Sequence, residues 1–224
     1  MGEDTKIFNT FFHEKTRLYK THMKRSTLIT AIALILSACA TPPAKEVTAA
    51  LKGNYTLDPT HTRLGWSLSH AGLSNYTARF DTVSGTLDFD SDDPARSMLD
   101  IRIDPKSVST GLPDFDDTLA TSRNYFDAER FPEIRFVSTN IRQFSDTTGK
   151  ITGDLTLRGI TKPVTLDVIF NGAGKSFGNP GKTLGFSATG KFNRSDFGMN
   201  YLIKLAGIGD EITLRIETEF NEAR

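Results

Sequence analysis

The side chains best suited to chemistry in this sequence are a few histidines. Only four of the 224 residues are histidine, and one of them, His70, stands in the stretch WSLSHAG. Alternation of apolar and polar residues is typical of a half-buried strand, and it puts Trp66, Leu68 and His70 on one face. A histidine at the end of such a wall can donate a hydrogen bond to a polar group, and it gains charge near its ordinary pKa of about 6.5. The alternative is a structural histidine that bonds to a loop carbonyl.

The other polar groups offer less specific chemistry. We expect His61, in the stretch DPTHT, to order the first turn together with Asp58. The spacing of the histidines matches no zinc pattern, which requires three or four close ligands, and we expect no metal. Arg194, in FNRSDFGMN, can pair with a phosphate or carboxylate through its planar guanidinium, or form an internal ion pair with Asp196.

Catalysis and nucleic-acid binding are not indicated. We interpret the sequence as lacking both a glycine-rich phosphate loop of the Walker or dinucleotide type and the G-x-S-x-G nucleophile elbow of a hydrolase. Acidic and basic residues balance at 27 each and form no blocks, so a nucleic-acid surface is not expected. We therefore expect neither catalytic residues nor a cofactor, and we keep an uncharacterised hydrolase as an alternative.

The front of the chain carries an export signal. The run that begins at Met23 has two basic residues and then an apolar stretch of about ten residues, too short to span a membrane, so residues 23–38 are predicted to be a signal peptide. The sequence LSAC at its end resembles the lipobox of bacterial lipoproteins, which implies cleavage before Cys39 and a diacylglycerol on its sulfur. Cys39 is the only cysteine and cannot form an internal disulfide. The alternative is an ordinary signal peptide with an incidental cysteine.

The signal peptide also sets the expected boundaries and location. Residues 1–22 precede a complete signal, and we interpret them as a mis-assigned extension, with a long charged n-region as the alternative. Residues 39–52 are predicted to be a tether, and residues 53–224, about 170 in number, are long enough for one domain. The sorting of similar lipoproteins implies the periplasmic face of the bacterial outer membrane because Ala40 follows the cysteine. Without lipidation we expect the periplasm.

Period-two alternation dominates the predicted domain. The expected strands are Gly53–Leu57, Arg63–His70, Ala78–Phe89, Met98–Ile103, Ile134–Phe144, Asp154–Arg158, Val164–Phe170, Leu184–Phe192 and Ile212–Glu217. Only Asp116–Phe131 is typical of a helix. A long sheet with one apolar face must pack on a second sheet or close on itself, and closure hides its edges. Short hairpin spacing favours an all-β, up-and-down antiparallel barrel of about eight strands over an immunoglobulin-like sandwich.

Six stretches, spread in order over Tyr55–Glu219, resemble the YceI-like family. They are YTLDPTHTRLGWSLSHAG, FDTVSGTLDFD, YFDAERFPEIRFVSTNI, GDLTLRGITKPVTLDVIF, FSATGKFNRSDFGM and IGDEITLRIETE. The resemblance implies a lipocalin-like barrel with an elongated apolar tunnel, dimeric in many members, that binds polyisoprenoid or other long-chain amphiphiles. This chain departs from the pattern at Thr118, where many members have histidine, so no role of that histidine carries over.

The alternation and the resemblance together define a candidate site. We predict that the ligand-binding residues are Trp66, Leu68, His70, Phe80, Phe126, Phe136, Phe186, Phe192 and Arg194. The expected partners are an isoprenoid or acyl-chain lipid, the membrane through the lipid anchor, and a second copy of the chain if it forms a homodimer. We expect binding, and carriage, of a polyisoprenoid or fatty-acid-like lipid in the envelope. The alternative is a structural or adhesive lipoprotein whose barrel is filled by its own side chains, because sixteen phenylalanines can also form an ordinary core.

Overall fold

A computed structural model of the chain describes residues 42–47, 50–176, 179 and 181–223. The strands described below all lie in one compact unit, Pro43–Arg224. The predicted signal peptide, the lipidation site at Cys39 and the extension over residues 1–22 lie outside the described residues.

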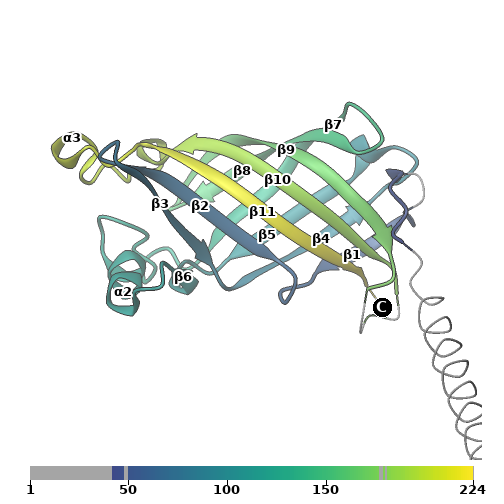
Figure 1. Cartoon of the computed structure of the whole chain (residues 1–224), viewed down its shortest axis with the longest axis horizontal. Coiled ribbons are helices and arrows are strands. Elements are labelled where there is room, and N and C mark those ends of the chain that lie inside the picture. Colours follow the sequence, from purple (N-terminus) through teal and green to yellow (C-terminus); the bar gives the residue numbers. More distant parts are fainter. Residues whose placement is uncertain (1–41, 48–49, 177–178, 180, 224) are drawn as a thin grey trace, which may run out of the picture. The chain divides into compact units, whose positions relative to one another are not determined.

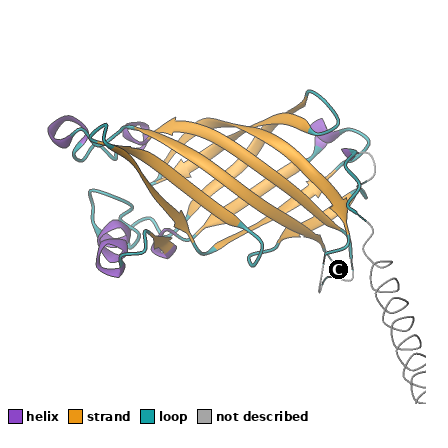
Figure 2. Ribbon diagram, in the orientation of Figure 1, coloured by secondary structure: helices purple, strands orange, loops and turns teal. Residues whose placement is uncertain are grey.

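The described residues form eleven antiparallel strands in one sheet (Figure 2). The strands are β1 (Gly53–Leu57), β2 (Arg63–His70), β3 (Ser74–Phe80), β4 (Val83–Phe89), β5 (Met98–Ile103), β6 (Val108–Ser109), β7 (Ile134–Gln143), β8 (Thr148–Leu157), β9 (Ile160–Gly174), β10 (Thr183–Asn193) and β11 (Glu211–Glu222). The pairing β1-β4-β5-β7-β8-β9-β10-β11 returns from β11 to β1, so these eight strands close into a barrel. The predicted lipocalin-like barrel is confirmed.

Three further strands extend the barrel at one end. β11 pairs with β1 through its last residues and with β2 through Thr213–Glu217, so β2 continues the line of β1 after the turn at residues 58–62. β3 pairs with β2 and with β6. The strand predicted over Ala78–Phe89 is therefore two strands, β3 and β4, separated by residues 81–82. The break lets one half pair beyond the ring while the other half closes it.

The helices in the described part of the chain are short, and none is long and apolar enough to cross a membrane. They are α2 (Pro113–Thr121), α3 (Ile203–Ala206) and the 3₁₀ turns η2 (Pro94–Arg96), η3 (Pro105–Ser107) and η4 (Arg194–Phe197). The helix predicted over Asp116–Phe131 is wrong at both ends. It begins earlier because proline suits the first helical position. It ends at Thr121 because the chain turns back, and Ala128 N–H donates to Ala120 O across the helix end.

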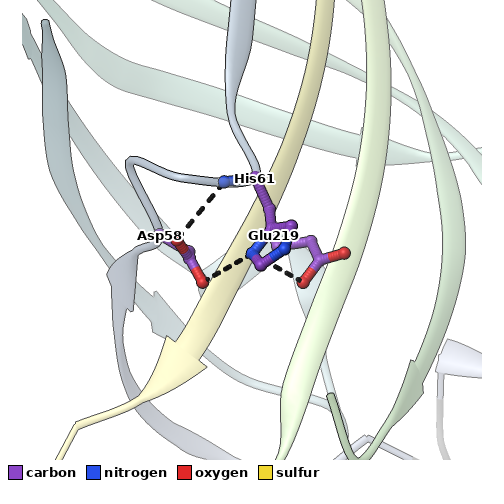
Figure 3. Close-up of side chains that lie close together, drawn as sticks. All are labelled: Asp58, His61 and Glu219. Carbon is purple, nitrogen blue, oxygen red and sulfur yellow. Dashed lines mark hydrogen bonds and ion pairs between the residues drawn. The ribbon is translucent and has the colours of Figure 1, made fainter. Parts of the chain in front are cut away.

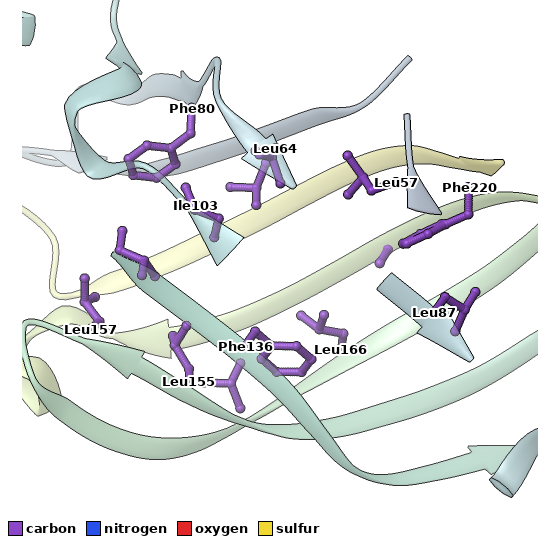
Figure 4. Close-up of a cluster of buried hydrophobic side chains, with 14 of the residues drawn as sticks. Leu57, Leu64, Phe80, Leu87, Ile103, Phe136, Leu155, Leu157, Leu166 and Phe220 are labelled. Carbon is purple, nitrogen blue, oxygen red and sulfur yellow. The ribbon is translucent and has the colours of Figure 1, made fainter. Parts of the chain in front are cut away.

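Alternation places one side of every barrel strand in the interior. On β11, for example, Ile212 and Phe220 are buried, whereas Glu211 is exposed. Figure 4 shows apolar side chains from opposite walls, among them Leu64 and Leu166, pointing towards the same interior space. The apolar residues thus face one another across the barrel.

Part of the predicted tether lies against the barrel. Ala44 and Ala173, near the end of β9, exchange two backbone hydrogen bonds of 2.8 Å, and Val47 is buried. The neighbouring Gly172 allows this close approach, because a Cβ at that position would lie 2.9 Å from the carbonyl oxygen of Ala44. The compact unit therefore begins before the first strand, at Pro43.

Candidate ligand-binding cavity

A cavity of about 630 Å³ runs through the barrel. Its lining reaches exposed residues at the end where β2 and β3 extend beyond the ring, which we call the opening, and at the turn between β7 and β8 at the other end. Its wall is mostly apolar, and every strand of the ring contributes inward-facing residues to it. All nine residues predicted to bind ligand lie on this wall: Trp66, Leu68, His70, Phe80, Phe126, Phe136, Phe186, Phe192 and Arg194. Their contact with a ligand stays a prediction.

The aromatic residues of the wall form two groups that the sequence does not separate. Farther from the opening, the Phe186 ring lies 5.4 Å from the Phe170 ring and 6.0 Å from the Phe220 ring. Nearer the opening, the Phe126 ring lies 5.2 Å from Phe80 and 6.4 Å from Trp66. Tilted and edge-on pairs of this kind are each worth about 0.5–1.5 kcal/mol beyond their buried area. Both groups therefore stiffen the wall while leaving space between them.

His70 lies at the rim of the opening, as predicted. It is the last residue of β2, it is exposed, and Gly72, with a φ of +71°, turns the chain immediately after it. Its backbone pairs with Ser74 and, through an isolated bridge, with Ile208. Within the described residues its imidazole makes no hydrogen bond. The alternative, a ring that donates to a loop carbonyl, is therefore not observed there. The ring is free to bond a ligand.

Arg194 bonds to backbone carbonyls of the protein and not to Asp196. Its guanidinium is buried and donates to four backbone carbonyls, those of Met199, Tyr201, Ile208 and Gly209, at 2.9–3.3 Å. The expected ion pair with Asp196 is wrong, because the carbonyls take these donors. Burial lowers the pKa of Arg194, and the charge of Asp210 opposes that effect. Arg194 thus holds the loop over residues 199–209 at the edge of the opening.

Three tyrosines that sequence reasoning missed also line the opening: Tyr76, Tyr125 and Tyr201. The rings of Tyr125 and Tyr201 lie 5.6 Å apart, and Arg158 donates to the carbonyl of Tyr125. Burial raises the pKa of Tyr125, and the neighbouring Tyr201 adds to the rise. The available signal was the pair Tyr125-Phe126, two adjacent aromatic residues after the predicted helix. These phenols supply hydrogen-bonding groups beside His70.

A second polar cluster, shown in Figure 3, lies on the outer wall of the barrel. His61 Nδ1 is 3.0 Å from Asp58 Oδ2 and 4.0 Å from Glu219 Oε2. Partial burial alone would raise the pKa of Asp58, but hydrogen bonds from Thr60, His61 and Asn221 hold it well below its usual range. The hydrogen bond to Asp58, then the charges of Asp58 and Glu219, raise the pKa of His61. The prediction that His61 orders the first turn with Asp58 is confirmed.

One serine motif escaped the sequence interpretation. Residues 174–178, GKSFG, fit the letters of the nucleophile elbow, although residues 177 and 178 lie outside the described part. A nucleophile elbow joins a strand to a helix, whereas this stretch lies between β9 and β10. Ser176 Oγ donates to Glu219 Oε2 at 3.3 Å, and no hydrogen bond joins Ser176 to His61 in the part of the chain that is described. Ser176 therefore lacks the strand-to-helix position of a nucleophile elbow.

The fold and the cavity define a lipocalin-like barrel with an internal apolar site. The chain belongs to the YceI-like family, whose domain matches residues 55–220. A UPF0312 protein of Photorhabdus laumondii is 34% identical over 201 residues, which are 88% of this chain and 97% of that protein.

Two solved structures share the architecture. The Campylobacter jejuni YCEI protein is 33% identical with a TM-score of 0.59, and the match covers 68% of this chain and 88% of that one. A polyisoprenoid-binding domain from Saccharophagus degradans, at 17% identity, has the same fold with a TM-score of 0.55 over 75% of this chain and 98% of that one.

Replacing Arg194 by lysine is expected to destabilise the protein strongly. A single ammonium cannot reach four carbonyls that surround a planar guanidinium, so several buried acceptors lose their donor. We expect the free energy of unfolding, measured by urea denaturation, to fall by about 3 kcal/mol. Arg215→Lys, on the exposed face of β11, is the matched control and should change it by less than about 0.5 kcal/mol. Equal effects of the two changes would show that the carbonyl contacts contribute little.

The contribution of His61 to stability is expected to depend on pH. Because its folded-state pKa is raised, protonated His61 stabilises the folded state, fully below the ordinary pKa of about 6.5. This contribution is lost as the pH rises through the raised value. The difference in unfolding free energy between the natural protein and His61→Gln should therefore shrink from pH 6 to pH 9. A difference that stays constant, or grows, over this range would contradict the assignment. Asp58→Asn should reduce the pH dependence, because only the charge of Glu219 then raises the pKa of His61.

Proposed function

We propose that this protein binds a long-chain amphiphile, a polyisoprenoid or fatty-acid-like lipid, in the cavity of its barrel and carries it in the bacterial envelope. The observation that supports this proposal most directly is a continuous apolar cavity that opens at a rim of polar side chains. A barrel with a solely structural or adhesive role has no need of such a space. The similarity of its fold to the polyisoprenoid-binding domain of Saccharophagus degradans is in accord with this choice.

The cavity volume limits the length of the enclosed chain. A methylene group takes up roughly the volume of a water molecule, about 30 Å³, so a cavity of about 630 Å³ holds roughly twenty carbons. At about 0.8 kcal/mol for each buried methylene, burial supplies a gross free energy of about 16 kcal/mol, which exceeds the usual cost of ordering a ligand. A fatty acid fits entirely, whereas a longer polyisoprenoid extends through the opening.

The polar end of the ligand belongs at the rim. His70 has a free imidazole there, and Tyr76, Tyr125 and Tyr201 place phenol groups around the same opening. Apart from Arg194, the charged residues of the lining, Arg142, Asp146 and Lys150, lie at the hairpin of β7 and β8 at the other end, and the wall between the two ends is apolar. Binding, and not catalysis, is the activity that this arrangement favours, because an apolar wall provides neither a nucleophile nor a general base.

Ligand binding is expected to be visible in the fluorescence of Trp66, which is the only tryptophan of the chain and lines the cavity. Protein purified from its native source should release a long-chain species on denaturing extraction, identified by mass spectrometry. After delipidation, a brominated fatty acid should quench Trp66, because bromine quenches only at short range. Repeated blank extractions together with an absence of quenching would favour the structural alternative.

A matched pair of variants separates cavity binding from surface adsorption. Ala188 is buried on the cavity wall, so Ala188→Phe fills part of the space and should weaken the quenching titration by about tenfold or more. Ile169→Phe adds a similar ring at an exposed position of β9 and should leave the titration unchanged. His70→Ala should alter the preference between acid and alcohol head groups more than the affinity for the chain.

We also propose that the protein is exported and held on the periplasmic face of the outer membrane by a lipid on Cys39. The motif LSAC after an apolar run supports this proposal. In the producing bacterium, the mature N-terminal peptide should begin at Cys39 and carry the mass of diacylglycerol. Cys39→Ser should remove the mass of diacylglycerol from the protein. An unmodified cysteine in the mature protein would contradict lipidation and leave the proposed cavity function intact.

A further inference from the structure

Two loops beside the cavity opening expose leucine side chains almost completely. Leu73, in the turn between β2 and β3, is 87% exposed, and Leu205, in α3, is 92% exposed. Ala71 N–H donates to Gly207 O at 3.1 Å, so the two loops are joined. Figure 1 shows them together as the outermost part of the barrel at the left, beyond the ends of the strands. We call residues 71–73 and 202–207 the tip.

Two residues of the tip have a left-handed backbone. Ala71 and Leu202 are two of the few residues other than glycine with a left-handed backbone in the described chain, with φ of +54° and +62°. Such conformations are unfavourable for residues with a side chain, and they tend to persist at functional sites. Turns at such positions usually carry glycine, asparagine or aspartate. Fully exposed leucines at a turn of this kind indicate a surface that becomes covered.

The charges around the tip favour an anionic partner. Residues 69–78 and 199–209 contain no aspartate or glutamate, and Lys204, next to Leu205, is the only lysine or arginine among them. A lysine near the surface of an anionic membrane contributes favourably to binding, and a nearby carboxylate would oppose it.

The area of the tip is too small for a stable dimer. Two leucine side chains bury on the order of 200 Å² together, whereas a stable interface needs about 800 Å² on each partner. A bilayer requires no such area, because each inserted side chain transfers into hydrocarbon independently. The small size of the tip therefore favours a membrane over a second copy of the chain.

We propose that the tip inserts Leu73 and Leu205 into the surface of an anionic phospholipid bilayer, so that the cavity opens directly onto lipid. This inference rests on the proposed function in one respect, since a ligand of roughly twenty carbons passes from bilayer to barrel without crossing water only if the opening touches the membrane. Insertion of the tip itself does not depend on the identity of the ligand.

Insertion is tested by a fluorescent label on the full-length chain. Cys39→Ser removes the only cysteine, and Leu205→Cys then allows a single NBD label at the tip. Vesicles of phosphatidylcholine with phosphatidylglycerol should shift its emission to the blue and raise its intensity several-fold, with a smaller effect in phosphatidylcholine alone. The control label at Met98→Cys, an exposed apolar position on β5, should not respond. Equal responses at the two positions, or none at the tip, would overturn the proposal.

A second measurement removes the apolar contact instead of reporting it. The background is the Cys39→Ser protein. In it, Leu73→Ser together with Leu205→Ser should weaken vesicle binding through the tip by a factor on the order of 100. The matched control, Met98→Ser with Ile169→Ser, should leave it unchanged. All four positions are exposed, so the changes should not affect folding. Circular dichroism checks this.

The two hypotheses fail in different ways. If the tip label stays in water while Trp66 still reports ligand binding, membrane insertion is wrong and the proposed function stands. If the label enters vesicles but the cavity takes no ligand, the insertion stands without the proposed function. Sedimentation analysis covers the remaining alternative, because a dimer that Leu73→Ser with Leu205→Ser converts to a monomer would make the tip an interface between copies and overturn the membrane assignment.

Discussion

Hydrogen bonding between β1 and β11 is the interaction on which the rest of the molecule depends, because it closes the sheet into a ring. The register opposes Leu57 to Phe220, and both side chains are buried in the interior. With this pair in place, the alternation along every other strand directs its apolar residues to the same space. Eight strands enclose more volume than their inward side chains fill, so closure leaves a cavity in the barrel.

The opening of this cavity is built differently from its wall. β3 pairs on one side only with the two-residue strand β6, and Phe126, in the chain that follows α2, packs there against Phe80. On the opposite side, Arg194 donates to backbone carbonyls of a loop and so holds that loop in place. Among the described residues no charged partner lies within salt-bridge distance of Arg194. The rim is therefore formed by irregular chain that side-chain contacts keep in position, while ladders of backbone hydrogen bonds keep the wall rigid.

The polar groups of the protein divide between two regions with separate tasks. The cluster of Asp58, His61 and Glu219 lies on the outer wall and bonds the turn between β1 and β2, so its protonation bears on the stability of that turn. His70 and the tyrosines surround the opening, next to the exposed leucines of the tip. The apolar tip, the polar rim and the apolar cavity thus follow one another along the barrel.

The sequence by itself determined most of the barrel, because alternation is a local property that each strand carries alone. Gly53–Leu57, Arg63–His70 and Met98–Ile103 have the predicted bounds, and His70 lies at the rim as its position before Gly72 indicated. Only the tertiary structure decided the partners of Arg194, the end of α2, and the attachment of Ala44 to Ala173. Each of these depends on backbone groups from distant or irregular segments, which leave no periodic pattern in the sequence. Which phenylalanines line the cavity and which pack in the core is a tertiary property for the same reason. In the sequence the two kinds look alike, and only closure of the sheet separates them.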